Sequence, residues 1–296
     1  MDKLNAIKVF KRVVELESFT KAADDLMLSR AAISKNIAEL EQFLGCALIK
    51  RTTRTMHLTP AGLDYYQSVC QLLEMWDIAD ENAMSSSSSM KGEFTVSIPV
   101  SLGLLSIQPK LCQFAAGYPD LQLNIILSDE KVDLVSRGVD VAIRGSGLLK
   151  DSSLKAKKLH SIERVLCATP TYLADAHQQL STPHDIEHHN CLVYSLSSSP
   201  TTWLFYNDQE EAQIDVRHVK MQANNTLALK HACLADFGLM LAPKVMVKEE
   251  INDGRLVSVL DDWRIPNHDL YAVYPTHKEH SIKVKSLINF MSEQLL

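Results

Sequence analysis

The chain has 296 residues, of which 46% are hydrophobic and 22% charged, and a formal net charge of −6, which is typical of a soluble protein with two or three globular domains. The acidic balance excludes a wholly basic nucleic-acid coat. No stretch approaches the roughly 18 uninterrupted apolar residues of a membrane span. The N-terminus has charges throughout and lacks the apolar block of a signal peptide, so we expect a cytoplasmic protein.

The charge is unevenly distributed along the chain. Residues 1–60 hold ten Lys and Arg against seven Asp and Glu, a net of +3. Residues 61–90 hold five acidic residues and no Lys or Arg. Any contact with a polyanion is therefore expected in the N-terminal fifth.

Three short helices are predicted first. Residues 3–16 place apolar side chains on one helical stripe, and Thr20 can cap a second helix. Ser29 is a natural N-cap for a third helix, which Gly45 would end as an αL C-cap. Helix, short turn and helix is the helix-turn-helix arrangement, whose second helix enters the major groove of DNA.

The third helix has two different faces. One face is apolar and consists of Ile33, Ile37, Leu40 and Leu44. On the other face, Arg30 can bond to guanine or phosphate, Ser34 to either, and Ala31 can contact a thymine methyl, while Lys35 supplies charge for the DNA backbone. The alternative is an ordinary solvated helix face.

Two short strands are expected at 46–59, with Lys50, Arg51 and Arg54 near their tip. Such a basic hairpin can lie along the minor groove or the flanking phosphates as a wing.

A long helix follows at 60–84. Its apolar stripe recurs every three or four residues and consists of Leu63, Tyr66, Cys70, Leu73 and Trp76. The stripe predicts pairing with a second copy of the chain, and the alternative is packing within the same chain. The serines at 85–89 predict a flexible linker.

From Gly92 the pattern changes to alternating strands and helices, including a strand at 216–223 and helices at 131–138 and 225–236. Such alternation predicts mostly parallel sheets covered by helices.

The segment 18–62, SFTKAADDLMLSRAAISKNIAELEQFLGCALIKRTTRTMHLTPAG, resembles the DNA-binding region of LysR-type transcriptional regulators. The positions in register are Phe19, Thr20, Ala22, Ala23, Leu26, Ser29, Ile33, Ser34, Ile37, Leu40, Glu41, Leu44, Gly45, Leu48, Arg51, Leu58, Thr59, Ala61 and Gly62. Arg30, Ala31 and Lys35 replace the frequent Gln, Pro and Arg of the family, so the operator preference of relatives does not transfer.

The resemblance extends over the whole chain and implies its organisation. It implies an α/β protein with a winged helix-turn-helix domain at 1–58, a linker and dimerisation helix with a serine-rich hinge at 59–90, and an effector-binding domain at 91–296. That domain is expected to be periplasmic-binding-protein-like (type 2), with lobe one at 91–161 and 268–296 and lobe two at 162–267.

The family also implies partners: a palindromic promoter site in double-stranded DNA, a homodimer that assembles further into a tetramer, and a small-molecule effector. RNA polymerase is a further candidate partner. We expect no cofactor, no metal and no membrane contact.

The effector is expected in the cleft between the lobes, near Ser101, Ser128, Arg144 and Asn225. Free N–H groups near Ser101 can bind a carboxylate or phosphate, and Arg144 can clamp an anion, which favours an anionic effector. Arg144 can alternatively pair with a neighbouring carboxylate, and Asn225 can simply cap the helix at 225–236.

The sequence leaves three alternatives to a DNA-binding regulator that responds to a small molecule. A thiol switch at Cys167 or Cys233 needs an exposed thiol of low pKa. An enzyme is not expected, because the histidines at 184–189 accompany no catalytic or metal motif. A solute-binding protein without a DNA role is not expected, because such a protein does not need the winged domain that the sequence predicts.

Overall fold

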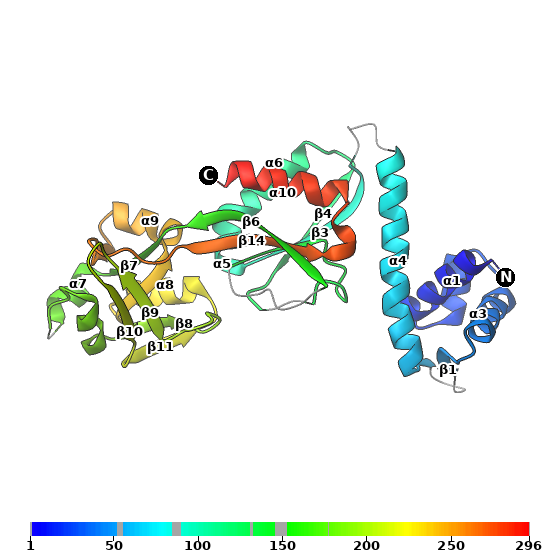
Figure 1. The fold of residues 1–296 in the computed structure, drawn as a ribbon, viewed down its shortest axis with the longest axis horizontal. Coiled ribbons are helices and arrows are strands. Elements are labelled where there is room, and N and C mark those ends of the chain that lie inside the picture. Colours follow the sequence, from blue (N-terminus) through cyan, green and yellow to red (C-terminus); the bar gives the residue numbers. More distant parts are fainter. Residues whose placement is uncertain are drawn as a thin grey trace. The chain divides into compact units, whose positions relative to one another are not determined.

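The computed structural model of the protein describes residues 2–51, 56–84, 90–130, 133–145, 153–176 and 178–295. The chain divides into two compact units, Met1–Ser86 and Ser87–Leu296 (Figure 1).

The first unit begins with three helices, α1 (Lys3–Leu16), α2 (Phe19–Asp25) and α3 (Arg30–Leu44). The Ser29 hydroxyl accepts a hydrogen bond from Ala32 N (3.1 Å), and Gly45 adopts a left-handed φ of 71°, so both predicted ends of α3 are confirmed. The prediction that Thr20 caps the second helix is wrong. Ser18 is extended and accepts from Lys21 N (3.2 Å), so α2 starts earlier and Thr20 lies within its first turn.

One core joins these helices. Ile33, Ile37 and Leu40 of α3 are fully buried together with Phe10 of α1. At the surface, the Arg12 guanidinium of α1 donates two hydrogen bonds of 2.6 Å to the Asp25 carboxylate, at the end of α2. This bidentate pair links α1 to α2 at the surface, and the shared core packs all three helices together.

The wing consists of β1 (Ile49–Arg51) and β2 (Met56–Leu58), which pair antiparallel. The Glu41 carboxylate of α3 accepts hydrogen bonds from Leu48 N (2.8 Å) and Ile49 N (3.0 Å). One side chain of α3 therefore holds the start of the wing. Arg54 lies outside the described residues.

Helix α4 (Pro60–Met84) starts against the wing. The Thr59 hydroxyl accepts from Gly62 N (2.9 Å) and donates to Ala47 O (2.7 Å). A Cβ at Gly62 would lie 2.0 Å from the backbone oxygen of Leu48. Glycine is required there because the α4 backbone directly contacts the wing.

The apolar side chains of the predicted stripe on α4 differ in burial, so the stripe is not one uniformly exposed face. Tyr66 packs on Phe10, and Leu73 is buried in the core of its own unit with Val69. Leu73 is thus covered and Tyr66 partly covered within their own chain, as the alternative of packing within the same chain predicts. Leu63 and Trp76 are about half exposed, Cys70 is intermediate, and Leu72 and Met75 are also about half exposed.

The second unit has two five-stranded mixed sheets. The order in the first lobe is β4-β3-β5-β14-β6, and in the second β11-β8-β12-β7-β13. The first-lobe strands are β3 (Gly92–Ile98), β4 (Leu121–Leu127), β5 (Val141–Gly145), β6 (Leu154–Ile162) and β14 (His268–Pro275). The second-lobe strands are β7 (Arg164–Ala168), β8 (Cys191–Tyr194), β11 (Val219–Ala223), β12 (Leu239–Pro243) and β13 (Val257–Val259).

Helices cover both sheets (Figure 1). They are α5 (Val100–Leu102), which continues through a π-helical turn (Gly103–Ile107) into α6 (Gln108–Ala116), then α7 (Pro170–Asp175), a 3-10 helix (Pro183–His188), α8 (Thr226–Leu234), α9 (Lys244–Asn252), a 3-10 turn (Thr276–Lys278) and α10 (Ile282–Gln294). Leu227 of α8 and Met246 of α9 pack against the core of the first lobe, so the two lobes are in direct apolar contact.

The expectation of mostly parallel sheets is only half right. Each sheet has two parallel and two antiparallel pairings. Strand β14 returns from the second lobe and inserts between β5 and β6, antiparallel to both. The chain crosses between the lobes as extended strands and not through a helix that covers a sheet. At these crossings strands and helices therefore do not alternate along the chain.

The helix predicted at 131–138 is wrong for the described residues, and one hairpin has no counterpart among the predicted elements. The described residues 133–138 form a turn, in which the Asp133 carboxylate accepts from Val135 N and Ser136 N and so competes with helix formation. The hairpin of β9 (Thr202–Tyr206) and β10 (Glu211–Asp215) was not predicted. Asn207 forms its turn by accepting from Gln209 N and Glu210 N.

The contact between α4 and the wing leads to a test. In Gly62→Ala a backbone atom must move, which costs about 1–3 kcal/mol. The gain in helix propensity from Gly to Ala offsets about 1 kcal/mol of this cost, so we expect the free energy of unfolding to fall by up to about 2 kcal/mol. Thermal denaturation of the full chain measures the change. Gly117→Ala, whose Cβ would approach only to 3.4 Å, is the control. Equal Tm values for both variants would contradict the account.

Candidate functional site

The N-terminal half of α3 presents the predicted DNA-contacting residues on one exposed face. Arg30 and Ala31 are exposed, and the Lys35 side chain is 76% exposed. Its ammonium lies 3.9 Å from Glu39, a distance at which an exposed pair contributes little. Ser34 is half-buried between this face and the core. The face is therefore available to a partner, and its hydrogen-bonding and cationic groups suit the edges and phosphates of DNA.

The other residues predicted to contact DNA differ in how far the structure supports that role. Thr20 is exposed on α2, and Ser29 uses its hydroxyl as the N-cap of α3. The backbone of Arg51 lies in β1, but its side chain and the whole of Arg54 lie outside the described part of the chain. The sequence analysis missed Met27, which is 92% exposed in the turn before α3 with a left-handed φ of 53°.

The four predicted effector residues lie at the ends of strands in the second unit. Ser101 follows β3, Ser128 follows β4, Arg144 lies near the end of β5, and Asn225 follows β11 in the other lobe. Ligand sites in open α/β sheets form at such strand ends. The Ser128 hydroxyl accepts from Glu130 N (3.2 Å), and Ser128 N donates to Ile98 O at the end of β3 (3.0 Å).

Hydrogen bonds connect the two lobes at this junction. The buried Ser101 hydroxyl accepts from Leu227 N of α8 (3.2 Å). Asn225 caps α8, since its oxygen accepts from Leu227 N (3.0 Å) and Ala228 N (3.3 Å), as the capping alternative predicted. The amide of Asn225 also donates to Asp129 of the first lobe (3.2 Å).

Arg144 is the charged group at the centre of the junction and is only 7% exposed. It donates to the Ser97 hydroxyl (2.6 Å) and to Ile143 O (2.8 Å). Burial lowers the pKa of Arg144, and the nearby Asp129 carboxylate opposes that shift. Burial, with Asp129 as a further cause, raises the pKa of Tyr194 to about 12. Sequence reasoning missed Asp129 and Tyr194, since neither belongs to a motif.

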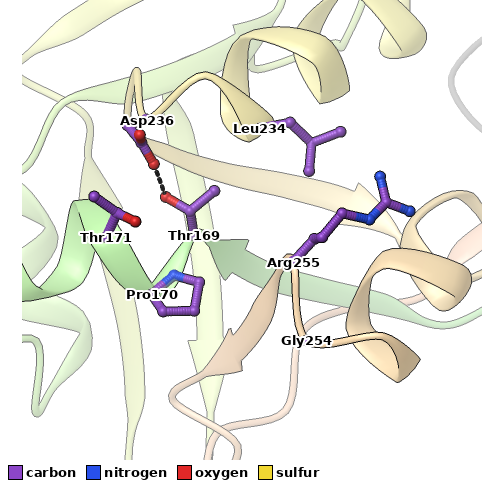
Figure 2. A pocket seen from close by; sticks show the side chains of 7 residues that line it. All are labelled: Thr169, Pro170, Thr171, Leu234, Asp236, Gly254 and Arg255. Carbon is purple, nitrogen blue, oxygen red and sulfur yellow. Dashed lines mark hydrogen bonds between the residues drawn. The ribbon is translucent and has the colours of Figure 1, made fainter.

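A separate pocket of about 420 Å³ lies in the second lobe (Figure 2). It is lined by Thr169, Pro170, Thr171, Leu234, Asp236, Gly254 and Arg255. Thr169 donates to Asp236, and Arg255 extends away from Thr169 toward solvent, where it pairs with Asp253 (2.7 Å). None of the four predicted effector residues lines this pocket, so it is separate from the junction at which they lie.

The three cysteines of the second lobe and one of its histidines, His189, are buried. Cys167, Cys191 and Cys233 are fully buried, and burial raises the pKa of Cys191 to about 12. The pKa of Cys167 is also raised, chiefly by its hydrogen bond with Cys233. His189 is buried against Tyr172. No group of His, Cys, Asp and Glu among the described residues could hold a metal ion.

Comparisons with known proteins agree with these two units. Residues 4–63 match the bacterial regulatory helix-turn-helix family of LysR type, and residues 87–296 match the LysR substrate-binding domain. The chain belongs to the LysR family of transcriptional regulators. The predicted family and fold class are confirmed, and a LysR regulator binds DNA through its first domain and a small-molecule effector through its second.

Three relatives of this LysR regulator cover nearly its whole length. An uncharacterized HTH-type regulator of Haemophilus influenzae is 34% identical over 98% of this chain and 100% of its own. The regulator PtxR of Pseudomonas aeruginosa is 33% identical over 99% of this chain and 93% of its own. The full-length structure of AphB, a virulence activator of Vibrio cholerae, is 31% identical, covers 99% of both chains and has a TM-score of 0.60.

The relatives are transcriptional regulators, and the solute-binding alternative without a DNA role is excluded by the family of the first domain. In the part of the chain that the structure describes, no helix is long and apolar enough to cross a membrane.

The exposed face of α3 leads to a test with Lys35→Ala. We expect the variant to bind operator DNA more weakly by about 1 kcal/mol or more, because a cationic contact is lost. If that contact is a phosphate, the salt dependence also falls by about one counterion. Fluorescence anisotropy at several salt concentrations measures both. The control is Lys248→Ala, an exposed lysine of the second unit. Unchanged affinity of Lys35→Ala would remove Lys35 from the interface.

Proposed function

We propose that this LysR regulator reads a palindromic promoter site with two copies of α3, one from each subunit of a dimer. The observation that carries this proposal is that α3 has one buried face and one exposed face. Its apolar face is fully buried in its own unit, whereas Arg30, Ala31 and Lys35 are exposed at its N-terminal end. Base-reading helices meet the major groove with such an end. Ser34 would add a hydroxyl contact, and Thr20, Ser29, Arg51 and Arg54 would contact the flanking backbone.

The domain assignment belongs to the same proposal. Residues 1–58 bind DNA, residues 59–90 connect and pair the subunits, and residues 91–296 respond to the effector, with lobe one at 91–161 and 268–296 and lobe two at 162–267. We propose a cytoplasmic protein that has no catalytic activity, in which the effector contacts Ser101, Ser128, Arg144 and Asn225.

The dimer contact is assigned to a face of α4 that shares only Trp76 with the stripe that the sequence predicts. Leu72, Met75 and Trp76 are each at least half exposed and lie three and four residues apart, which places them along one side of the helix. Exposed apolar side chains in such an arrangement suit pairing with the same helix of a second copy. Leu63 is 48% exposed but lies nine residues from Leu72, about two and a half turns away and hence on the opposite side.

A thiol switch is the less favoured regulation. A solved structure of one relative is the regulatory domain of AphB from Vibrio vulnificus treated with cumene hydroperoxide. In this chain the three cysteines of the second lobe are fully buried, and the pKa values of Cys167 and Cys191 are raised, so their thiolates form poorly.

The matched pair Leu72→Asp and Leu63→Asp tests this assignment. We expect Leu72→Asp to lower the sedimentation coefficient, because a charge would be buried without a partner. We also expect it to weaken binding to a two-half-site operator by at least about tenfold, since the second half-site no longer binds in the same complex.

Leu63→Asp should leave both properties unchanged. If Leu63→Asp dissociates the assembly and Leu72→Asp does not, the stripe predicted from the sequence is the interface. If neither variant changes the assembly, α4 does not pair the subunits.

A further inference from the structure

Asp129 places a carboxylate between the two lobes. Its Oδ1 accepts a hydrogen bond from Val100 N of the first lobe (2.9 Å), and its Oδ2 accepts from Asn225 Nδ2 of the second lobe (3.2 Å). Each oxygen is thus held by one lobe. Val100 and Asn225 lie at the strand ends where the predicted effector residues are found. The Asp129 carboxylate therefore lies between the two lobes at the predicted effector position.

The donors around Asp129 suit any carboxylate. A backbone N–H, a side-chain amide and a nearby buried cation are the groups that stabilise an ionised carboxylate. Arg144 has five N–H donors, and its described hydrogen bonds go to Ser97 and to Ile143 O, neither of which is a carboxylate. Burial lowers the pKa of Arg144, and the charge of the half-buried Asp129 opposes that shift.

We propose that the junction between the lobes takes a small molecule bearing a carboxylate, and that Asp129 occupies the carboxylate position from within the chain until that molecule displaces it. This inference rests on the proposed effector role of the second unit and names the chemical class of the effector.

Displacement follows from the donors. The backbone N–H of Val100 is a single donor, and Asp129 already uses it (2.9 Å). The incoming carboxylate therefore replaces Asp129 and does not bind beside it. When Asp129 leaves, its direct link to Asn225 is lost, and the lobes are then joined through the bound molecule. The effector thus has different affinities for the two arrangements, as a regulatory ligand must.

Chemical rescue of Asp129→Ala by acetate tests the inference without the natural effector and without DNA. The variant removes the internal carboxylate and leaves its donors in place. We expect a lower Tm for Asp129→Ala than for the wild type. Sodium acetate should then raise the Tm of the variant saturably, by about 2–4 °C at about five times its Kd for a domain of this size. Sodium chloride at equal ionic strength and neutral acetamide should have no such effect.

Two matched variants make the result specific. Glu130→Ala removes a neighbouring carboxylate that is exposed, and its Tm should respond to acetate no more than that of the wild type. The double variant Asp129→Ala with Asn225→Asp keeps a residue that caps α8 well but replaces the amide donor by a carboxylate, so the acetate effect should disappear. If Asp129→Ala does not fold, Asp129→Ser leaves comparable room and is measured instead.

Equal responses of the wild type, Asp129→Ala and Glu130→Ala to acetate would overturn the inference, as would equal rescue by acetamide or chloride. This result is independent of the proposed DNA-reading role, because specific operator binding can succeed or fail in the same preparations whatever acetate does to the Tm.

Discussion

The burial of one face of α3 is the constraint on which the DNA-binding unit depends. Ile33, Ile37 and Leu40 are fully buried, and each such side chain contributes about 1.5–3 kcal/mol relative to exposure. The ion pair of Lys35 with Glu39, at 3.9 Å on the surface, contributes about 0–1 kcal/mol. The core therefore decides how α3 is rotated, and Arg30 and Lys35 face outward as a consequence. Glu41 and Gly62 then attach the wing and α4 to the same framework.

In the second unit a different constraint applies, because the centre of the junction is charged. Arg144 is buried, which is costly for a guanidinium without a compensating anion. Asp129 lies near this group and accepts hydrogen bonds from both lobes. The proposed role of Asp129 as an internal carboxylate depends on these two hydrogen bonds.

Local chemistry made much of the first unit predictable from the sequence. Ser29 and Gly45 mark the ends of α3 because their roles depend on neighbouring backbone groups. The orientation of α4 was less predictable. Its apolar residues occur on more than one side, and only the position of α1 determines that Tyr66 and Leu73 are covered while Leu72 and Met75 remain exposed. Likewise, the sequence places Arg144 and Asn225 at strand ends, but Asp129 is 96 residues from Asn225 and only the fold brings them together.

The most direct test of the central claim is a hydroxyl-radical footprint of the wild-type protein on DNA from immediately upstream of its own gene, where regulators of this kind often bind. Two copies of α3 on one duplex predict two protected half-sites whose centres lie one helical turn, about 10–10.5 base pairs, or a whole number of turns apart. Both half-sites should become protected at the same protein concentration. Unrelated DNA should show no protected half-site. A single protected half-site, or equal protection of unrelated DNA, would contradict the reading of a palindromic site by paired α3 helices.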